Sequence, residues 1–465
     1  MNFTSLNFLL LFPLACIIYY LLPYKWRWGY LLVVSYAFYL SWQPVYGLIL
    51  AGVTLMSYFS ALQIERKKEA AKTWFTIGVI VSLLPLVFFK YYNFINESIF
   101  GAFSAIDWNF RLPEMKLLMP IGISFFTFMA VGYMVDVYKG KSKAEHNIGL
   151  YALFVSFFPQ VTSGPIGRAD QLISQLKEPE HLKYENVVIG LKTMLWGYLM
   201  KLCVSDRLGI YVDAVFNNVA NHNGTTYFLT SILYTIQIYG DFAGYSLVAI
   251  GAARIMGICL MENFKRPYFA TSDKDFWRRW HISLSSWMRD YVYIPLGGSR
   301  VAKPRHHLNI FMTMIVSGIW HGAAWTFVFW GALHGIAQVL QTLWNRYVTK
   351  FAIPKFIKVI LCFMFVNIAW VFFRSPDFGT AFHMITSMFT SFGKPFIDLP
   401  VFLNGFLSLA IVLVKDVCDE YEKQMVETEM FRGGVAKNTL VIIAIAMYVL
   451  LFGVLDGGQF IYFQF

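Results

Sequence analysis

Two histidines in strongly apolar surroundings, His281 and His321, are the residues of this 465-residue chain best suited to chemistry. An ionisable side chain at membrane depth is costly and marks a functional site by default. An imidazole that titrates near neutral pH can take a proton from a hydroxyl or a thiol. The competing interpretation of His321 is a packing role, with its ring bonded to a neighbouring carbonyl. The elements that carry the two histidines decide whether they can work together.

The composition is that of a membrane protein. Hydrophobic residues make up 57% of the chain and charged residues only 14%, whereas soluble domains carry about 25% charged residues. Apolar runs recur at the length of about 20 residues that a membrane-spanning helix needs. They are too long and continuous for the strands of a barrel, so we predict an all-α polytopic membrane protein. The net charge of +11 is explained by basic residues that flank spans, and nucleic acid is not expected as a partner.

The apolar segments suggest a topology. They fall near residues 5–22, 28–42, 45–63, 74–92, 116–137, 187–204, 227–258, 308–320, 323–341, 356–373, 400–415 and 438–455. The loops at 64–73 and 138–147 are rich in basic residues, and such loops usually lie in the cytoplasm. This places the N-terminus on the outside. The 227–258 segment exceeds one bilayer and is expected to kink or break near Asp241 and Gly244. We find no internal repeat or linker, which indicates a single integral domain over 1–465.

The stretch 148–167 predicts irregular backbone. Its apolar part, residues 148–162, already contains Pro159, and Gly164, Pro165 and Gly167 follow it. Prolines and glycines of this kind break helices. Broken backbone at membrane depth is tolerated only inside protein or along a wet cavity. A re-entrant element is therefore expected here.

The stretch 276–296 is too polar to span a membrane and has helical spacing. Its apolar residues Trp280, Leu284, Trp287, Tyr291 and Ile294 recur every three or four positions, and Arg278, His281, Ser285 and Arg289 share the other face. An amphipathic helix is predicted, either lying in the membrane interface or folded inward to line a cavity. The surrounding charge is positive, which favours the cytoplasmic side and would attract a phosphate-rich ligand.

The apolar run 308–320 leads directly to His321. As a helix it is roughly 20 Å long, which reaches into a hydrocarbon core about 30 Å thick without crossing it. Gly318 and Gly322 flank the histidine. The pattern fits either a hairpin or a broken span that carries the histidine in its middle.

Other polar residues carry weaker signals. His334 and His383 lie on apolar segments, where histidines are more often satisfied core residues. Gln237 and Asp241 form a polar patch in an apolar run, which predicts either a tunnel lining or hydrogen bonds between helices. Metal-ligand spacings, a GxSxG elbow, a Walker A loop and GxGxxG are all absent from the sequence. We therefore expect no metal and no permanently bound cofactor.

Several motifs together resemble the membrane-bound O-acyltransferase family, and in particular its bacterial branch that O-acetylates alginate. They are PIGISFFTF (120–128), FFPQ…GPI (157–166), YTIQIYGDFAGYS (234–246), ENFKRPY (262–268), FWRRWHISLSSWMRDYVYIPLGG (276–298), SGIWHG (317–322) and WVFFR (370–374). The resemblance implies about eleven transmembrane helices with short re-entrant helices, and a signature core at about 116–374. The family's invariant histidine corresponds to His321, and its second signature position corresponds to His281.

The resemblance also implies a reaction and its partners. In this branch an acetyl group passes from cytoplasmic acetyl-CoA across the bacterial inner membrane to an extracytoplasmic polysaccharide, with a periplasmic SGNH-hydrolase-like protein as the expected partner and membrane lipid around the chain. His321 would be the general base or a transient acyl carrier, and His281 would orient the thioester. Candidate tunnel residues are Trp280, Ser285, Asp290, Trp320, Gln237 and Asp241. Candidates for binding the CoA phosphates are Arg278, Arg279 and Arg289, although ordinary flanking charge explains each of them too.

Two alternatives remain open from the sequence. The first keeps the family and changes the cargo to D-alanine, transferred from a carrier protein to teichoic acid. The second is a transporter or flippase for a polysaccharide precursor, since intramembrane histidines and broken helices also suit proton-coupled carriers. Inverted repeats would favour a transporter, and we find none in the sequence.

Overall fold

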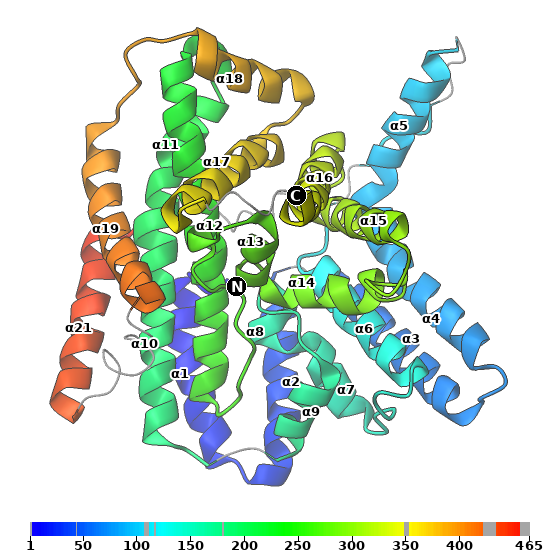
Figure 1. Cartoon of the computed structure of the whole chain (residues 1–465). Coiled ribbons are helices and arrows are strands. Elements are labelled where there is room, and N and C mark those ends of the chain that lie inside the picture. The colour runs from blue at the N-terminus through cyan, green and yellow to red at the C-terminus, as the bar shows by residue number, and fades with distance from the viewer. Residues whose placement is uncertain are drawn as a thin grey trace. The chain divides into compact units, whose positions relative to one another are not determined.

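The computed structural model describes residues 2–42, 44–106, 111–115, 118–178, 181–347, 353–421 and 434–455. Every regular element in these ranges is a helix, which confirms the predicted all-α class (Figure 1). The chain forms two compact units. Unit 1 contains Met1–Asn186, Ala253–Met261 and Gly322–Ala324, and unit 2 contains Val187–Ala252, Glu262–His321 and Trp325–Phe465. Each unit is described separately below, and the single domain expected over 1–465 stays a prediction.

Unit 1 is built from the N-terminal helices. They are α1 (Leu6–Leu21), α2 (Tyr24–Leu40), η1 (Pro44–Tyr46), α3 (Gly47–Arg66), α4 (Ala71–Leu86), η2 (Val87–Tyr91), α5 (Tyr92–Ser104), α6 (Ile123–Tyr138), α7 (Ile148–Ser156), α8 (Phe158–Val161) and α9 (Ala169–Lys177). The predicted irregular segment appears as the short helices α7 and α8. The turn before α6 packs tightly on the end of α8, because a Cβ on Gly122 would lie 1.9 Å from the Val161 carbonyl oxygen. Gly122 also has a φ of +74°, so glycine is required there on both counts.

Unit 2 holds most of the remaining helices. They are α10 (Tyr184–Tyr198), η3 (Leu199–Ser205), α11 (Asp206–Phe216), η4 (Val219–Asn221), α12 (Gly224–Ile255), η5 (Pro267–Phe269), α13 (Asp273–Arg279), α14 (Ile282–Met288), η6 (Arg289–Tyr293), α15 (Lys303–His321), α16 (Trp325–Tyr347), α17 (Lys355–Arg374), α18 (Phe378–Thr390), α19 (Leu399–Tyr421) and α21 (Val435–Phe452). The last residues of α12 belong to unit 1.

Six helical stretches in the described part of the chain are long and apolar enough to cross a membrane. They are Pro44–Arg66, Ala71–Ser104, Tyr184–Phe216, Lys355–Arg374, Leu399–Tyr421 and Val435–Phe452, and two shorter apolar helices are Leu6–Leu21 and Ile123–Tyr138. The protein is therefore a multi-pass membrane protein, while the expected number of eleven spans is not confirmed. The predicted segment 116–137 begins at two residues outside the described ranges, and its helix α6 starts at Ile123.

Helix α12 corrects one prediction. It continues without interruption for 32 residues, so of the kink or break expected near Asp241 and Gly244, the break does not form. Gly244 instead permits a close helix crossing. A Cβ at Gly244 would lie 2.7 Å from the carbonyl oxygen of Gly197, and a Cβ at Gly197 would lie 2.6 Å from that of Gly244. The glycine that looked like a helix breaker is therefore explained by packing of α12 against α10.

A buried charge network lies beside this crossing. The Lys201 ammonium, in the π-helical turn η3, lies 2.7 Å from Asp206 Oδ1 and 2.5 Å from Asp241 Oδ1. All three side chains are buried, with 3%, 7% and 1% of their surface exposed. Charged groups inside a membrane protein are tolerated when they pair with one another in this way. For Asp241, the structure thus shows the contact between helices that was the alternative to a tunnel lining.

Helices α15 and α16 form a hairpin, which decides between the two arrangements left open by the sequence. His321 is the last residue of α15, and α16 begins at Trp325. The helices touch backbone to backbone, because a Cβ on Gly318 would lie 2.4 Å from the Phe327 carbonyl oxygen. The end of α15, and with it His321, is thereby fixed against α16.

Candidate active site

The structure brings the two predicted histidines together within unit 2. The ring centroids of His281 and His321 are 6.4 Å apart, with an angle of 60° between the ring planes. Both side chains are buried, with 0% and 2% of their surface exposed. Residues 40 positions apart in the sequence therefore share one enclosed site, as expected for two groups that act on the same substrate.

His281 lies where the helix is interrupted. The predicted amphipathic helix over 276–296 is therefore wrong as a single element. Helix α13 ends at Arg279, and α14 begins at Ile282. Between them His281 has φ +43° and ψ 55°, which is the left-handed region. Non-glycine residues rarely adopt it, and they keep it only where the surroundings enforce it. The break turns His281 inward, away from the face it was predicted to share with Arg278.

Asn263 enforces this conformation, and the sequence interpretation missed it. Its backbone carbonyl accepts a hydrogen bond from the N–H of Ile282 at 3.0 Å. Its side-chain Oδ1 accepts another from the N–H of Ser283 at 3.2 Å, and its Nδ2 donates to Ser246 Oγ at 3.1 Å. Asn263 therefore ties the two residues after His281 to α12. It lies in the ENFKRPY motif, which was the only available signal for it.

Aromatic rings enclose the two imidazoles. The centroid of the His321 ring lies 4.9 Å from Trp320, 5.0 Å from Trp330 and 5.4 Å from Phe373. The His281 ring lies 4.5 Å from Phe242 and 5.7 Å from Trp320. Both imidazoles are thus almost fully shielded from solvent in this structure, and aromatic rings form much of their surroundings.

The burial of His281 also sets its protonation state. Loss of hydration lowers the pKa of this imidazole to about 3, because burial disfavours the charged form. His281 is therefore neutral at physiological pH. A neutral imidazole has one N–H donor and one acceptor nitrogen, so it can orient a polar group without adding a charge.

The predicted tunnel residues have different surroundings. Trp320 is buried and contacts both imidazoles. Trp280 is fully buried and packs 5.1 Å from Trp370, which stacks on Trp330 at 5.5 Å. It belongs to a tryptophan layer behind His321. Ser285 has a local role, since its Oγ donates to the Trp280 carbonyl at 3.2 Å.

The remaining tunnel candidates lie in other surroundings. The Asp290 carboxylate accepts from Arg289 Nε at 2.8 Å. Gln237 is buried on α12 against Gly209, where a Cβ would lie 2.7 Å from Gln237 Nε2. Asp241 is in the Lys201 network. These three residues are engaged in contacts of their own, and their part in a tunnel stays a prediction.

The three arginines proposed for the CoA phosphates are not equivalent. Arg279 is held by carboxylates, with its Nη1 2.8 Å from Glu420 and its Nε 3.2 Å from Asp275. Arg289 pairs with Asp290. Arg278 is exposed. Of the three, Arg278 is the one best placed to meet an anion from solution.

A basic groove in unit 2 offers a further anion site. It is lined by Leu296, Pro304, Arg305, Leu308, Asn309 and Met312. The exposed side chains of Arg300, Lys303 and Arg305 make no ion pair with the described residues, and the sequence has no Asp or Glu from 291 to 376. The N-terminus of α15 adds its partial positive charge at Lys303. A largely apolar lining that includes Arg305, with Arg300 and Lys303 close by in the sequence, suits a phosphate-bearing amphiphile.

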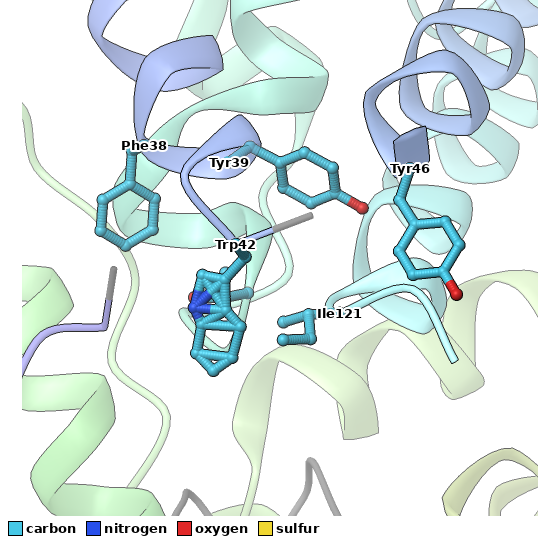
Figure 2. Close-up of a pocket in the computed structure, with 6 residues that line it drawn as sticks. Phe38, Tyr39, Trp42, Tyr46 and Ile121 are labelled. Atoms are coloured by element: carbon cyan, nitrogen blue, oxygen red, sulfur yellow. The ribbon is translucent and has the colours of Figure 1, made fainter. Parts of the chain in front are cut away.

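A second hollow lies in unit 1 and has a different character. It is lined by Phe38, Tyr39, Trp42, Tyr46, Ile121 and Thr162 (Figure 2). No carboxylate, histidine or cysteine is among these lining residues. An aromatic pocket of this kind supplies shape and apolar surface. The imidazole pair of unit 2 is therefore the better candidate for catalysis.

Comparisons of the sequence with known proteins give matches over most of the chain. A sequence model of "MBOAT, membrane-bound O-acyltransferase family" matches residues 142–375. The chain is 39% identical to a probable alginate O-acetylase of Pseudomonas aeruginosa, over 84% of this chain and 75% of that protein. It is 34% identical to a peptidoglycan O-acetyltransferase of Helicobacter pylori, over 79% and 74%. It is 29% identical to a teichoic acid D-alanyltransferase of Streptococcus thermophilus, over 68% and 72%.

Proposed function

Because the chain belongs to the membrane-bound O-acyltransferase family, and is thus an O-acyltransferase, we propose that it moves acetyl groups from cytoplasmic acetyl-CoA across the bacterial inner membrane. The acetyl group is destined for an extracytoplasmic polysaccharide. A periplasmic SGNH-hydrolase-like protein acts as the partner that completes the transfer to the sugar.

The observation that carries the proposal is the buried pair His281 and His321, whose rings lie 6.4 Å apart. The relatives that are 39% and 34% identical are named as a probable alginate O-acetylase and a peptidoglycan O-acetyltransferase. These names support an acetyl donor and a polysaccharide acceptor. Acetyl-CoA is the ordinary cytoplasmic form of activated acetate. The exposed cations Arg300, Lys303 and Arg305 suit its phosphates.

In the proposed reaction His321 is the general base. Its imidazole takes the proton of the acceptor hydroxyl while the hydroxyl oxygen attacks the thioester carbonyl carbon. The carbon–sulfur bond breaks, the CoA thiolate leaves, and the imidazolium returns its proton to the sulfur. Neutral His281 orients the thioester by donating a hydrogen bond to its carbonyl oxygen. In a second version His321 carries the acetyl group briefly before the hydroxyl attacks. Either way the products are an acetyl ester and free CoA.

Labelled donor tests the proposed function directly. Membrane vesicles that contain the protein and its native neighbours are given acetyl-CoA labelled either in the acetyl group or in the adenine. We expect acetyl label on polysaccharide or on a serine of the partner, and no transfer of adenine label. Absence of acetyl transfer from acetyl-CoA, in vesicles whose protein is folded, would contradict the proposal.

We propose that the donor phosphates bind at the basic groove. Replacing Arg300, Lys303 and Arg305 together by glutamine removes three exposed cations that make no ion pair with described residues. We expect the KM for acetyl-CoA to rise about tenfold, the effect of losing one or two charge-assisted hydrogen bonds, with kcat at saturating donor unchanged. Initial rates measured against donor concentration check this.

Two further variants distinguish basic residues that bind phosphate from basic residues that only flank membrane-spanning helices. A double variant with Arg346 and Lys358 replaced by glutamine removes exposed cations next to other apolar helices, and its KM should stay at the parent value. Arg278→Gln tests the arginine suggested by the sequence. An unchanged KM in the groove variant, with a raised KM in Arg278→Gln, would move the phosphate site to α13.

The second candidate function is transfer of D-alanine from a carrier protein to teichoic acid. It is supported by the 29% identity to a teichoic acid D-alanyltransferase. It predicts that acetyl-CoA is not a donor and that a D-alanyl thioester on a carrier protein is. The transporter alternative has no support from the family assignment. The labelled-donor experiment therefore distinguishes the two transferase reactions.

A further inference from the structure

We propose that Asp273 and His334 form a clamp that sets the spacing of His281 and His321; the proposal rests on the function proposed above. His334 Nδ1 lies 2.6 Å from Asp273 Oδ1, with 0% and 5% of the two side chains exposed. The sequence indicated only a satisfied core histidine at position 334. The structure instead places a buried carboxylate–imidazole pair next to the aromatic enclosure of the site.

The proton of this pair is assigned to His334 Nδ1. The Trp277 indole nitrogen, which can only donate, lies 3.3 Å from the same Nδ1. One nitrogen cannot both accept from the indole and donate to the carboxylate. The 2.6 Å contact has the length of a strong charge-assisted bond, so it takes precedence. His334 Nδ1 therefore donates to Asp273, and the indole of Trp277 packs alongside.

The clamp joins the two elements that lead to the active-site histidines. Asp273 is the first residue of α13, and α13 ends two residues before His281. His334 lies in α16, which packs against the last turns of α15 at Gly318, three residues before His321. A bond between Asp273 and His334 thus fixes α13 relative to the α15–α16 hairpin. The spacing of His281 and His321 depends on that placement.

A direct ring contact links the clamp to His321. The Trp330 ring is fully buried and lies 4.8 Å from the His334 ring and 5.0 Å from the His321 ring. It also stacks on Trp370 at 5.5 Å with an angle of 22°. Protein interiors are close-packed, so displacement of one ring is passed to its neighbours. Asp273 and His334 are therefore positioning residues for His321 and do not themselves touch the substrate.

Three variants test the clamp. His334→Phe keeps a ring but removes the donor, Asp273→Asn keeps the shape of the acceptor but removes its charge, and His334→Asn places an amide N–H near the position of Nδ1. We expect kcat at saturating acetyl-CoA, per folded molecule, to fall about 10²-fold in His334→Phe, as a misplacement of about 1 Å can cost. KM should stay unchanged, Asp273→Asn should be intermediate, and His334→Asn should recover most of the rate.

A matched control removes a different set of buried hydrogen bonds from unit 2. Asn367 accepts from Thr235 Oγ1 at 2.8 Å and donates to Ser231 Oγ at 3.0 Å. Asn367→Ala should reduce the yield of folded protein and leave kcat per folded molecule at the parent value. The clamp is refuted if His334→Phe keeps the parent kcat per folded molecule, or if His334→Asn is as slow as His334→Phe.

Failure of the clamp and failure of the proposed function give different results. If His321→Ala is inactive and His334→Phe has normal kcat, only the clamp is wrong. If His321→Ala remains active, the proposed role of His321 fails whatever the His334 variants do.

Discussion

Replacing His321 by alanine is expected to abolish acetyl transfer while the protein stays folded and inserted in the membrane. Loss of a general base should slow the reaction by about 10²–10⁴-fold. The imidazole is buried among Trp320, Trp330 and Phe373. The transfer rate is measured with labelled acetyl-CoA in vesicles. It is divided by the amount of folded protein, which is measured by fluorescence-detected gel filtration.

The control for this variant is another histidine of unit 2. His383 is exposed on α18, and His383→Ala should transfer acetyl groups at the parent rate. Near-parental transfer by His321→Ala would refute the role of this residue. Because His281 is neutral over the physiological range, we assign no step of a pH–rate profile between pH 5 and 8 to it. His281→Gln should lower the rate and leave the pH profile unchanged in shape.

Of the substitutions proposed for this protein, Lys201→Met is expected to lower the free energy of unfolding most. The change leaves Asp206 and Asp241 buried in one network without their shared cation. Breaking a buried ion pair by removing one partner typically costs about 3–5 kcal/mol. We expect little folded protein and a clearly lower midpoint of thermal unfolding, measured by tryptophan fluorescence in detergent.

Lys192 provides the matched comparison, because it is also a buried lysine in the same helical stretch. Its ammonium donates a hydrogen bond to the neutral amide of Asn438 at 2.6 Å. Because this partner carries no charge, we expect Lys192→Met to lower the stability less than Lys201→Met. Replacing Lys201 by methionine together with Asp206→Asn and Asp241→Asn should recover much of the stability. If Lys201→Met unfolds at the parent temperature, the network has no stabilising role.

The sequence by itself determined the fold class, and it singled out the two histidines that the structure brings together. Long apolar runs and scarce charges allow only a helical membrane protein, and the structure has helices close to most of the predicted segments. Periodicity placed Trp280, Leu284, Trp287, Tyr291 and Ile294 on one apolar face. The first three are buried, Tyr291 is half-buried and Ile294 is exposed. His281 and His321 stood out because a histidine is rare in apolar surroundings, which is a property that sequence alone displays.

Tertiary structure decided how these residues are held. The left-handed turn at His281 comes from hydrogen bonds with Asn263, so helical periodicity across 276–296 predicted a continuous helix that does not form. The role of Gly244 follows from the approach of Gly197, and the bond between Asp273 and His334 joins residues 61 positions apart. Each depends on contacts between distant parts of the chain. Hydrophobic periodicity reports only which face of an element is buried, and it carries no information about the partner that the face will meet.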